Sequence, residues 1–205
     1  MNERGSVADE QLVSLSRDGS LDAFNRLVER YQSAVYTLCL RLLGNAQAAE
    51  DASQETFLSA YRALPSFAGG NVRSWLLRIA ANESKDELRR RKRKDVADSL
   101  NEMFDAQDAP IEIAGDDPPT EMIVEQRELA AALQAALLLI PFDQRQAVLL
   151  CDYYGFHYEE VAGMTSASIG TVKSRIHRGR ERLRVILTGR PELFGREGRL
   201  DGRKG

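Results

Sequence analysis

The sequence is poor in the side chains on which redox and metal chemistry depend: its 205 residues include two cysteines, two histidines and one tryptophan. Cys39 and Cys151 stand far apart among aliphatic neighbours without CxxC spacing, which favours two buried thiols over a redox pair or half of a metal site. No apolar run approaches the roughly 20 residues of a membrane span. The first residues also lack the basic and apolar stretches of an export signal. These absences predict a cytoplasmic protein without a metal or other cofactor.

Two larger patterns are missing as well. The chain shows no sustained alternation of apolar and polar residues bounded by turn residues, which is the mark of a β-strand. It also shows no Ser-His-Asp set, no metal-ligand spacing and no phosphate-binding glycine loop. We therefore expect an all-α protein that is not an enzyme.

Helical periodicity is what the sequence has instead. Apolar residues at three-and-four spacing predict a first helix over 20–43, which Gly44 closes, and a second helix over 46–63, which Asn45 caps. Further helices are predicted over 72–93, 120–140, 142–154, 158–164 and 168–187. A chain of this length suits two small helical domains better than one large domain.

Charge is distributed unevenly along the chain, although the net charge is only −3. Residues 1–94 carry 15 basic and 12 acidic side chains, and residues 127–205 carry 13 basic and nine acidic ones. Residues 95–126 between them carry ten acidic side chains and no basic one, and three prolines interrupt this segment. Two basic blocks on a tether indicate two domains that face nucleic acid. The predicted organisation is a domain over 1–94, an extended acidic linker over 95–121, a second domain over 122–188 and a disordered tail over 189–205.

The clearest motif is a pair of helices across a tight turn within 157–187, which is the helix-turn-helix arrangement. A helical projection of its second helix gathers one apolar face: Ile169, Val172, Ile176, Gly179 and Leu183. The opposite face carries the polar residues Thr171, Lys173, Ser174, Arg175, His177 and Arg178. Ser168 is a good N-cap, and the free N–H groups after it, with Thr171, offer a seat for a DNA phosphate. This pattern is typical of a recognition helix in the major groove, and a solvated basic helix packed on a core is the alternative.

A similar segregation appears in the predicted helix 72–93. Its polar stripe is spaced four, three and four residues apart: Arg78, Asn82, Lys85 and Arg89. The helix runs into six consecutive cations over 89–94, which suit a sequence-independent grip on phosphates. An asparagine in the stripe offers a donor and an acceptor, as the reading of base edges requires. A solvated charge run is the alternative interpretation.

The predicted helix 46–63 has a different character. Its polar face combines acids, an amide and aromatic rings: Glu50, Asp51, Gln54, Phe57 and Tyr61. Alanines line the opposite face. An acidic rim with aromatic side chains suits a basic protein partner. Acids that favour the helix dipole are an equally good explanation of the same pattern.

Four segments in this order and spacing resemble regions two and four of the extracytoplasmic-function sigma factors. The resemblance covers about 20–93 and 122–187. The segments are AEDASQETF (49–57), VRSWLLRIAANESKDELRRRKR (72–93), IPFDQRQAVLL (140–150) and YEEVAGMTSASIGTVKSRIHRGRERL (158–183). The resemblance implies a transcription initiation factor that binds core RNA polymerase and promoter DNA and has a regulatory anti-sigma factor.

The resemblance also implies roles for individual residues. Asn82 and the loop 66–74 match the elements that read the −10 element and capture a flipped base. The acidic linker matches a segment that threads polymerase towards its active centre. Recognition-helix positions that enter the −35 groove correspond to Lys173, Ser174, His177 and Arg178. Residues that dock on the clamp helices of the largest polymerase subunit correspond to Glu50, Asp51, Gln54 and Glu55.

Three residues depart from the family pattern. His157 stands where the family has a Ser or Thr cap, and Ser166 replaces a turn glycine, which suggests a slightly altered turn. Gly179 replaces a small alanine and should cost up to ~1 kcal/mol of helix stability. A conventional helix-turn-helix regulator is the main alternative function, but it leaves the 72–94 stripe, the 46–63 face and the acidic linker unexplained.

Overall fold

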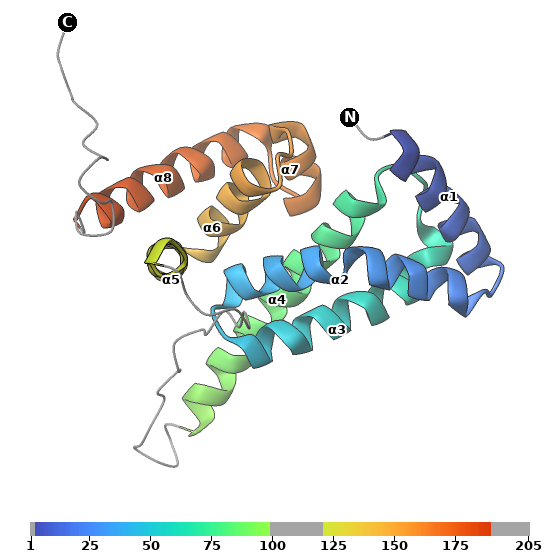
Figure 1. Ribbon diagram of the computed structural model, residues 1–205, viewed down its shortest axis with the longest axis horizontal. Coiled ribbons are helices and arrows are strands. Elements are labelled where there is room, and N and C mark those ends of the chain that lie inside the picture. The colour runs from blue at the N-terminus through green and yellow to red at the C-terminus, as the bar shows by residue number, and fades with distance from the viewer. Residues whose placement is uncertain (1–2, 99–120, 190–205) are drawn as a thin grey trace, which may run out of the picture.

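The computed structural model describes residues 3–98 and 121–189, and every regular element in these two stretches is a helix (Figure 1). The first stretch contains α1 (Glu3–Arg17), α2 (Leu21–Leu43), α3 (Ala46–Ala63), the short 3-10 helix η1 (Leu64–Ser66) and α4 (Val72–Asp98). The second contains α5 (Glu121–Leu139), α6 (Phe142–Val148), the π-helical η2 (Leu149–Tyr153), α7 (Tyr158–Thr165) and α8 (Ile169–Thr188). The predicted all-α class with two helical domains is confirmed.

Two elements differ from the sequence prediction. The first helix was predicted to begin at residue 20, but α1 precedes it and packs on α2, where Leu12 and Val13 are buried. The second difference concerns α4, which continues to Asp98, so that residues 95–98 are helical and not extended as predicted. The remaining residues of the predicted linker, 99–120, and the tail from 190 onward lie outside the described residues.

The predicted helix ends in the first domain are confirmed in detail. Gly44 adopts the left-handed conformation with φ 74°, and its N–H donates to the Leu40 carbonyl. The Asn45 side chain accepts a hydrogen bond from the Ala48 N–H at 2.8 Å. These two adjacent residues reverse the chain between α2 and α3, which places α3 alongside α2.

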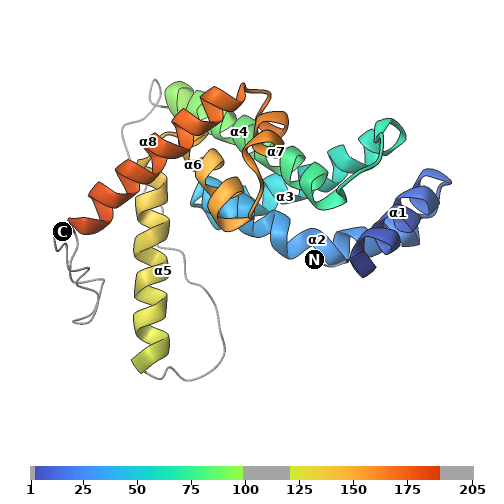
Figure 2. The same cartoon turned by 90° about the horizontal axis from the view of Figure 1, so that it is seen from above.

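The core of the first domain lies among α2, α3 and α4, which run side by side (Figures 1 and 2). Leu38 and Leu42 of α2 and Leu76 of α4 are fully buried there. Helix α3 has small buried side chains that allow α2 and α4 to approach it closely. These are Ala48, Ala49, Ala52 and Ala60. The opposite face of α3 is therefore left to solvent, as the alanine pattern predicted.

The second domain packs against the first. Helix α7 lies against α4, and both α5 and α6 contact α2. The two domains are in close contact at Gly44, where an added Cβ would overlap the side chain of Leu138 on α5. Buried residues of both domains thus form one continuous apolar cluster.

No described helix combines the length and the apolar character needed to cross a membrane. Across residues 3–98 and 121–189, no group of three or more His, Cys, Asp or Glu side chains is placed to hold a metal ion. Both cysteines are free thiols. Burial raises the pKa of the Cys39 thiol to about 11, whereas Cys151 is half-buried.

Candidate DNA-binding and partner-binding faces

Helix α8 sits on the second domain through the apolar face that its sequence predicts. Val172 and Ile176 are fully buried, and Gly179 lies against α6. A Cβ at position 179 would lie 2.7 Å from Val148 Cγ2 and 3.3 Å from the Gln144 carbonyl oxygen. Glycine therefore allows an approach that a larger residue would prevent. Ile169 was predicted on this buried face, but it is 41% exposed.

The turn before α8 keeps its left-handed geometry without a glycine. Ser166 ends α7 with φ 50° and ψ 41°, and it is the one non-glycine residue with positive φ in the described part of the chain. Ser166 thus adopts the left-handed conformation that a glycine would favour, and a serine there carries backbone strain. At the start of α7, the Glu160 carboxylate accepts a hydrogen bond from the His157 N–H at 2.8 Å.

The N-terminus of α8 is capped as predicted. The Ser168 hydroxyl accepts a hydrogen bond from the Thr171 N–H at 3.1 Å, and the two hydroxyl oxygens lie 2.8 Å apart. The cap thus occupies the Thr171 N–H, so a phosphate at this end would have to bind the N–H groups of Ile169 and Gly170.

The polar face of α8 is open to solvent at its centre and restrained at its flank. Lys173, Ser174, His177 and Arg178 are all exposed and lie together. Arg175 differs, because its guanidinium contacts the Asp143 carboxylate of α6 at 3.2 Å. Two further arginines are held in the same way: Arg180 by Asp152 at 2.5 and 3.0 Å, and Arg182 by Gln144 at 3.1 Å. The predicted base-reading residues are thus exposed, and among them the Ser174 hydroxyl donates to the Thr171 carbonyl at 3.1 Å, whereas Arg175 is held by an acid of another helix.

The four residues of the predicted stripe on α4 lie on one helix, and two of them, Lys85 and Arg89, form ion pairs. Arg78 and Asn82 are exposed. Lys85 Nζ lies 2.8 Å from the Asp143 carboxylate, across the boundary between the domains. Arg89 is exposed and contacts Asp86 on its own helix at 3.1 Å.

The run of cations after this stripe is not a row of free charges. Glu87 is only 7% exposed and forms ion pairs with Arg90 and with Arg91, the latter at 2.9 Å. Arg91 also donates to the Asn45 side chain at 3.0 Å. Two of the six cations are therefore paired with Glu87, and one of them, Arg91, also links α4 to the start of α3, which sequence reasoning did not anticipate.

The loop before α4 is held from both sides. Asn71 caps α4 by accepting from the Ser74 N–H at 3.0 Å, and the rings of Phe67 and Trp75 lie 4.7 Å apart. From α1, Arg17 Nε donates to the Leu64 carbonyl at 2.9 Å, and its guanidinium lies 6.0 Å from the Phe67 ring. Arg17 was missed in the sequence because the helix that carries it was not predicted.

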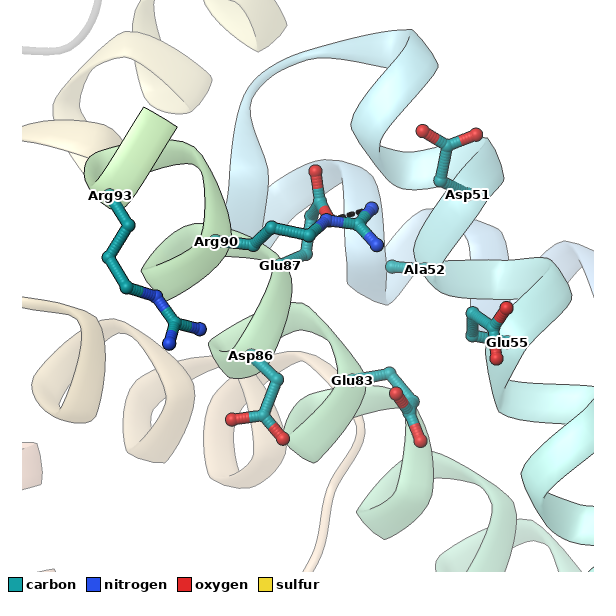
Figure 3. A pocket seen from close by; sticks show the side chains of 8 residues that line it. All are labelled: Asp51, Ala52, Glu55, Glu83, Asp86, Glu87, Arg90 and Arg93. Atoms are coloured by element: carbon teal, nitrogen blue, oxygen red, sulfur yellow. Dashed lines mark ion pairs between the residues drawn. The ribbon is translucent and has the colours of Figure 1, made fainter. Parts of the chain in front are cut away.

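The predicted acidic face of α3 extends onto α4. Glu50, Gln54 and Glu55 are exposed, and Asp51 is half-buried. A pocket between the two helices has Ala52 in its wall, and five acids and two arginines line it, as Figure 3 shows: Asp51, Glu55, Glu83, Asp86, Glu87, Arg90 and Arg93. Arg90, paired with Glu87, lies across one side of it. Glu83 and Asp86 were not predicted as part of this face, because the proximity of α3 and α4 is a tertiary feature.

A third cluster of functional side chains lies between the domains. Arg145 is buried and donates to the Leu42 carbonyl of α2 at 2.6 Å, and burial lowers the pKa of its guanidinium to about 10, so that it stays charged at neutral pH. The Lys85 ammonium holds the pKa of Asp143 below its usual range, although partial burial opposes this shift. Electrostatic contacts therefore join the domains at two separate points.

Comparison with known proteins identifies similarity to one family. The model for Sigma-70 region 2 matches residues 27–94, and the model for Sigma-70 region 4 matches residues 130–183. The chain is 39% identical over 168 residues to the ECF RNA polymerase sigma factor SigE of Mycolicibacterium smegmatis, covering 82% of this chain and 63% of that protein. It is 36% identical over 184 residues to the RNA polymerase sigma-H factor of Pseudomonas aeruginosa, covering 87% of this chain and 93% of that protein.

A solved structure is similar as well. The sigma factor RpoE from Bartonella quintana, crystallised in complex with the anti-sigma factor NepR, superimposes with a TM-score of 0.65 at 28% sequence identity. The match covers 82% of this chain and 98% of that chain.

Proposed function

The chain belongs to the extracytoplasmic-function sigma factors, and we propose that it binds core RNA polymerase through the α3–α4 acidic face and promoter DNA through α4 and α8. It is thus a transcription initiation factor, which directs polymerase to particular promoters and helps to open them. The role is one of binding without catalysis, and it is exercised in the cytoplasm, where its two partners meet.

The observation that carries the DNA part of the proposal is the free face of α8. A helix of 20 residues is anchored by Val172 and Ile176 and presents Lys173, Ser174, His177 and Arg178 to solvent. A helix in the major groove places its outermost face deepest, so the central side chains read bases and the shoulders contact phosphates. We assign this face to the −35 element, with Ser168, Thr171 and Arg175 at its edge.

Helix α4 serves the −10 element in this proposal. Exposed Asn82, flanked by Arg78, Lys85 and Arg89, provides the donor and acceptor that base reading requires among cations that attract phosphates. The loop that Asn71, Phe67 and Arg17 hold in place provides the site for a base flipped from the opened strand.

The acidic face serves polymerase. Glu50, Asp51 and Glu55 of α3, together with Glu83 and Asp86 of α4, concentrate negative charge beside the pocket of Figure 3. Gln54 adds a neutral amide to this face. Such a face steers and fixes a basic partner helix. An anti-sigma factor, as in the complex of the Bartonella quintana relative, is the third partner that we propose.

Run-off transcription with core polymerase on a pool of promoter sequences tests the function. We expect a defined set of promoters to be transcribed only when this protein is added. A conventional regulator would bind the same DNA but would leave core polymerase unable to initiate, and that result would contradict the proposal.

Charge reversal tests the polymerase face separately. Glu50→Lys with Asp51→Lys should reduce retention of core polymerase in a pull-down at moderate salt several-fold, because like charges then meet across the contact. Asp22→Lys with Glu29→Lys, which reverses two exposed acids on α2, is the matched control and should retain polymerase normally. If both double variants retain as much core polymerase as the wild type, the α3 acids do not bind polymerase and serve only to stabilise the start of their helix.

A further inference from the structure

The loop over 67–71 joins η1 to α4 and belongs to the stretch that we assign to the flipped base. Its outer residues are exposed: Ala68, Gly69, Gly70 and Asn71. Gly69 and Gly70 have φ 94° and 100°, and a Cβ added at either one would meet no atom of the described residues within 4 Å. Packing at the tip therefore does not fix the loop, and its conformation depends on how its two ends are held.

The first residue of the loop, Phe67, is held by side chains of two helices. Its ring is buried and lies 4.7 Å from the ring of Trp75 on α4. The Arg17 guanidinium at the end of α1 lies 6.0 Å from the same ring. Arg17 Nε also donates to the Leu64 carbonyl at 2.9 Å, and this carbonyl accepts the Phe67 N–H at 3.1 Å as well. One side chain of α1 thus contacts both the ring of Phe67 and the carbonyl to which the Phe67 backbone is bonded.

Helix α1 is fixed independently of these contacts. Leu12 and Val13 are buried, and the Asp9 carboxylate accepts a hydrogen bond from the Tyr31 hydroxyl of α2. Arg17 itself is an exposed residue, so its removal leaves no cavity in the core. Its contacts with the loop therefore serve the loop more than the stability of α1.

We propose that Arg17 is a positioning residue for the −10 site. It holds Phe67, and with it the loop, in the conformation that receives the flipped base, so that α1 takes part in promoter opening without touching DNA. This inference rests on the function proposed above for the loop. A loop that is ordered in advance loses less conformational entropy when the base enters it, so Arg17 favours capture of the base. Binding of polymerase and of the −35 element involves other faces and does not depend on Arg17.

Three variants separate this role from a role of charge. Arg17→Ala removes both contacts with the loop. Arg17→Gln is the conservative variant, because its amide nitrogen stands where Arg Nε stands and can donate to the Leu64 carbonyl without a positive charge. Arg26→Ala removes an exposed arginine from α2 and is the matched control.

The first readout is the fluorescence of Trp75, the single tryptophan of the chain, in the free full-length protein. The Trp75 ring lies against Phe67, so release of Phe67 exposes the indole to water and to a quencher. For Arg17→Ala we expect emission at longer wavelength and stronger quenching by acrylamide. Arg17→Gln should lie close to the wild type, and Arg26→Ala should equal it.

The second readout is promoter opening by the holoenzyme on a pool of promoters with a randomised −10 element. Arg17→Ala should lower the opening rate about two- to tenfold, the range that the loss of one hydrogen bond gives, and should flatten the preference at the flipped base. Arg17→Gln should restore most of the rate and of the preference. Retention of polymerase and the −35 preference should be unchanged in all three variants.

Three results would overturn the proposal. Unchanged Trp75 fluorescence in Arg17→Ala would show that Arg17 does not hold the loop. Equal loss of opening in Arg17→Ala and Arg17→Gln would mean that Arg17 acts through its charge, as a contact to phosphate would. Equal loss for every −10 sequence would show that the site for the flipped base is unaffected. Failure of the wild-type protein to initiate would contradict the sigma-factor function instead, and the fluorescence result, which needs neither DNA nor polymerase, is independent of it.

Discussion

Helices α4 and α8 carry similar densities of positive charge but use them differently. On α8 the central face is free, and the arginines around it, Arg175 and Arg180, are held by acids of the same domain. On α4 the cations are held by the helix itself, by Glu87 and Asp86, and by Asp143 of the other domain. The centre of the recognition helix is therefore exposed, whereas Lys85 of the α4 stripe is engaged by an acid of the other domain.

This difference separates two kinds of DNA contact. Side chains that their own domain already holds in place lose little conformational entropy when they bind DNA. Substitutions on such a face are therefore expected to change mainly the base preference. A face whose cations are already paired has to exchange those partners for phosphates, so its net gain from DNA binding is smaller. Substitutions on α4 and on α8 are therefore expected to differ in their effects.

The largest effect is expected at Asn82. Asn82→Ala should lower the rate of promoter opening by tenfold or more, because a good base contact is worth ~1–3 kcal/mol. Retention of core polymerase should stay near the wild-type level, since every acid assigned to polymerase, Glu83 and Asp86 of α4 included, is left unchanged. Permanganate footprinting measures opening, and a pull-down provides the control. A well-folded variant that fails to bind polymerase would show that this face of α4 is misassigned.

The next effect concerns the two arginines of α8 that differ in their partners. Arg178→Ala should cost ~1–3 kcal/mol at the preferred −35 sequence and flatten the preference at one base position. Arg175→Ala should weaken binding less and by the same factor for every sequence, because its guanidinium is already engaged by Asp143 at 3.2 Å. Binding of the full-length variants to a randomised −35 library at two salt concentrations distinguishes them. Uniform loss for Arg178→Ala would mean that α8 is rotated in its groove.

A smaller effect is expected at Gly179, where α8 packs against α6. Gly179→Ala should destabilise the protein by ~1–2 kcal/mol, because the new Cβ would meet Val148 at 2.7 Å and overpack the contact with α6. Gly163→Ala on α7 is the matched control: no atom lies within 4 Å of the added Cβ, so the change should be neutral or stabilising. Thermal denaturation followed by circular dichroism compares the two. Similar melting temperatures would show that α8 adjusts its position freely.

The smallest effect is expected at the turn before α8. Ser166→Gly should raise the free energy of unfolding by up to ~1 kcal/mol, because glycine adopts φ 50° without the Cβ clash that serine incurs. Urea denaturation measures the change, and −35 affinity should stay constant because the DNA-facing residues do not move. A destabilised variant would indicate that the serine side chain contributes more than its strain costs.

Much of this arrangement could be predicted from periodicity and capping. The helical repeat separated buried Val172 and Ile176 from exposed Arg178, and local chemistry identified Asn45 and Ser168 as caps. Such features depend on residues three or four positions apart, so a sequence contains the information directly.

The features that could not be predicted depend on tertiary contact. Lys85 and Asp143 are 58 positions apart, and nothing in either segment indicates that they meet. The pairing of Arg91 with Asn45 spans 46 positions, and it turns part of an apparent phosphate grip into a link between helices. Helix α1 was missed for another reason: its apolar pattern is short, it contains Gly5, and its contacts are tertiary. Leu12 and Val13 are buried, and Asp9 accepts from Arg30 and Tyr31 of α2.

Gly44 places two unrelated demands on one position. It ends α2 in a left-handed conformation with φ 74°, and the space where its side chain would stand is filled by Leu138 of the second domain. Asparagine tolerates that backbone conformation, but its Cβ would still collide with Leu138. Among descendants of this chain, a residue other than glycine at position 44 is therefore expected to appear together with a smaller residue at position 138. Covariation between these two positions would record the packing of α5 against the end of α2 in the evolutionary history of the protein.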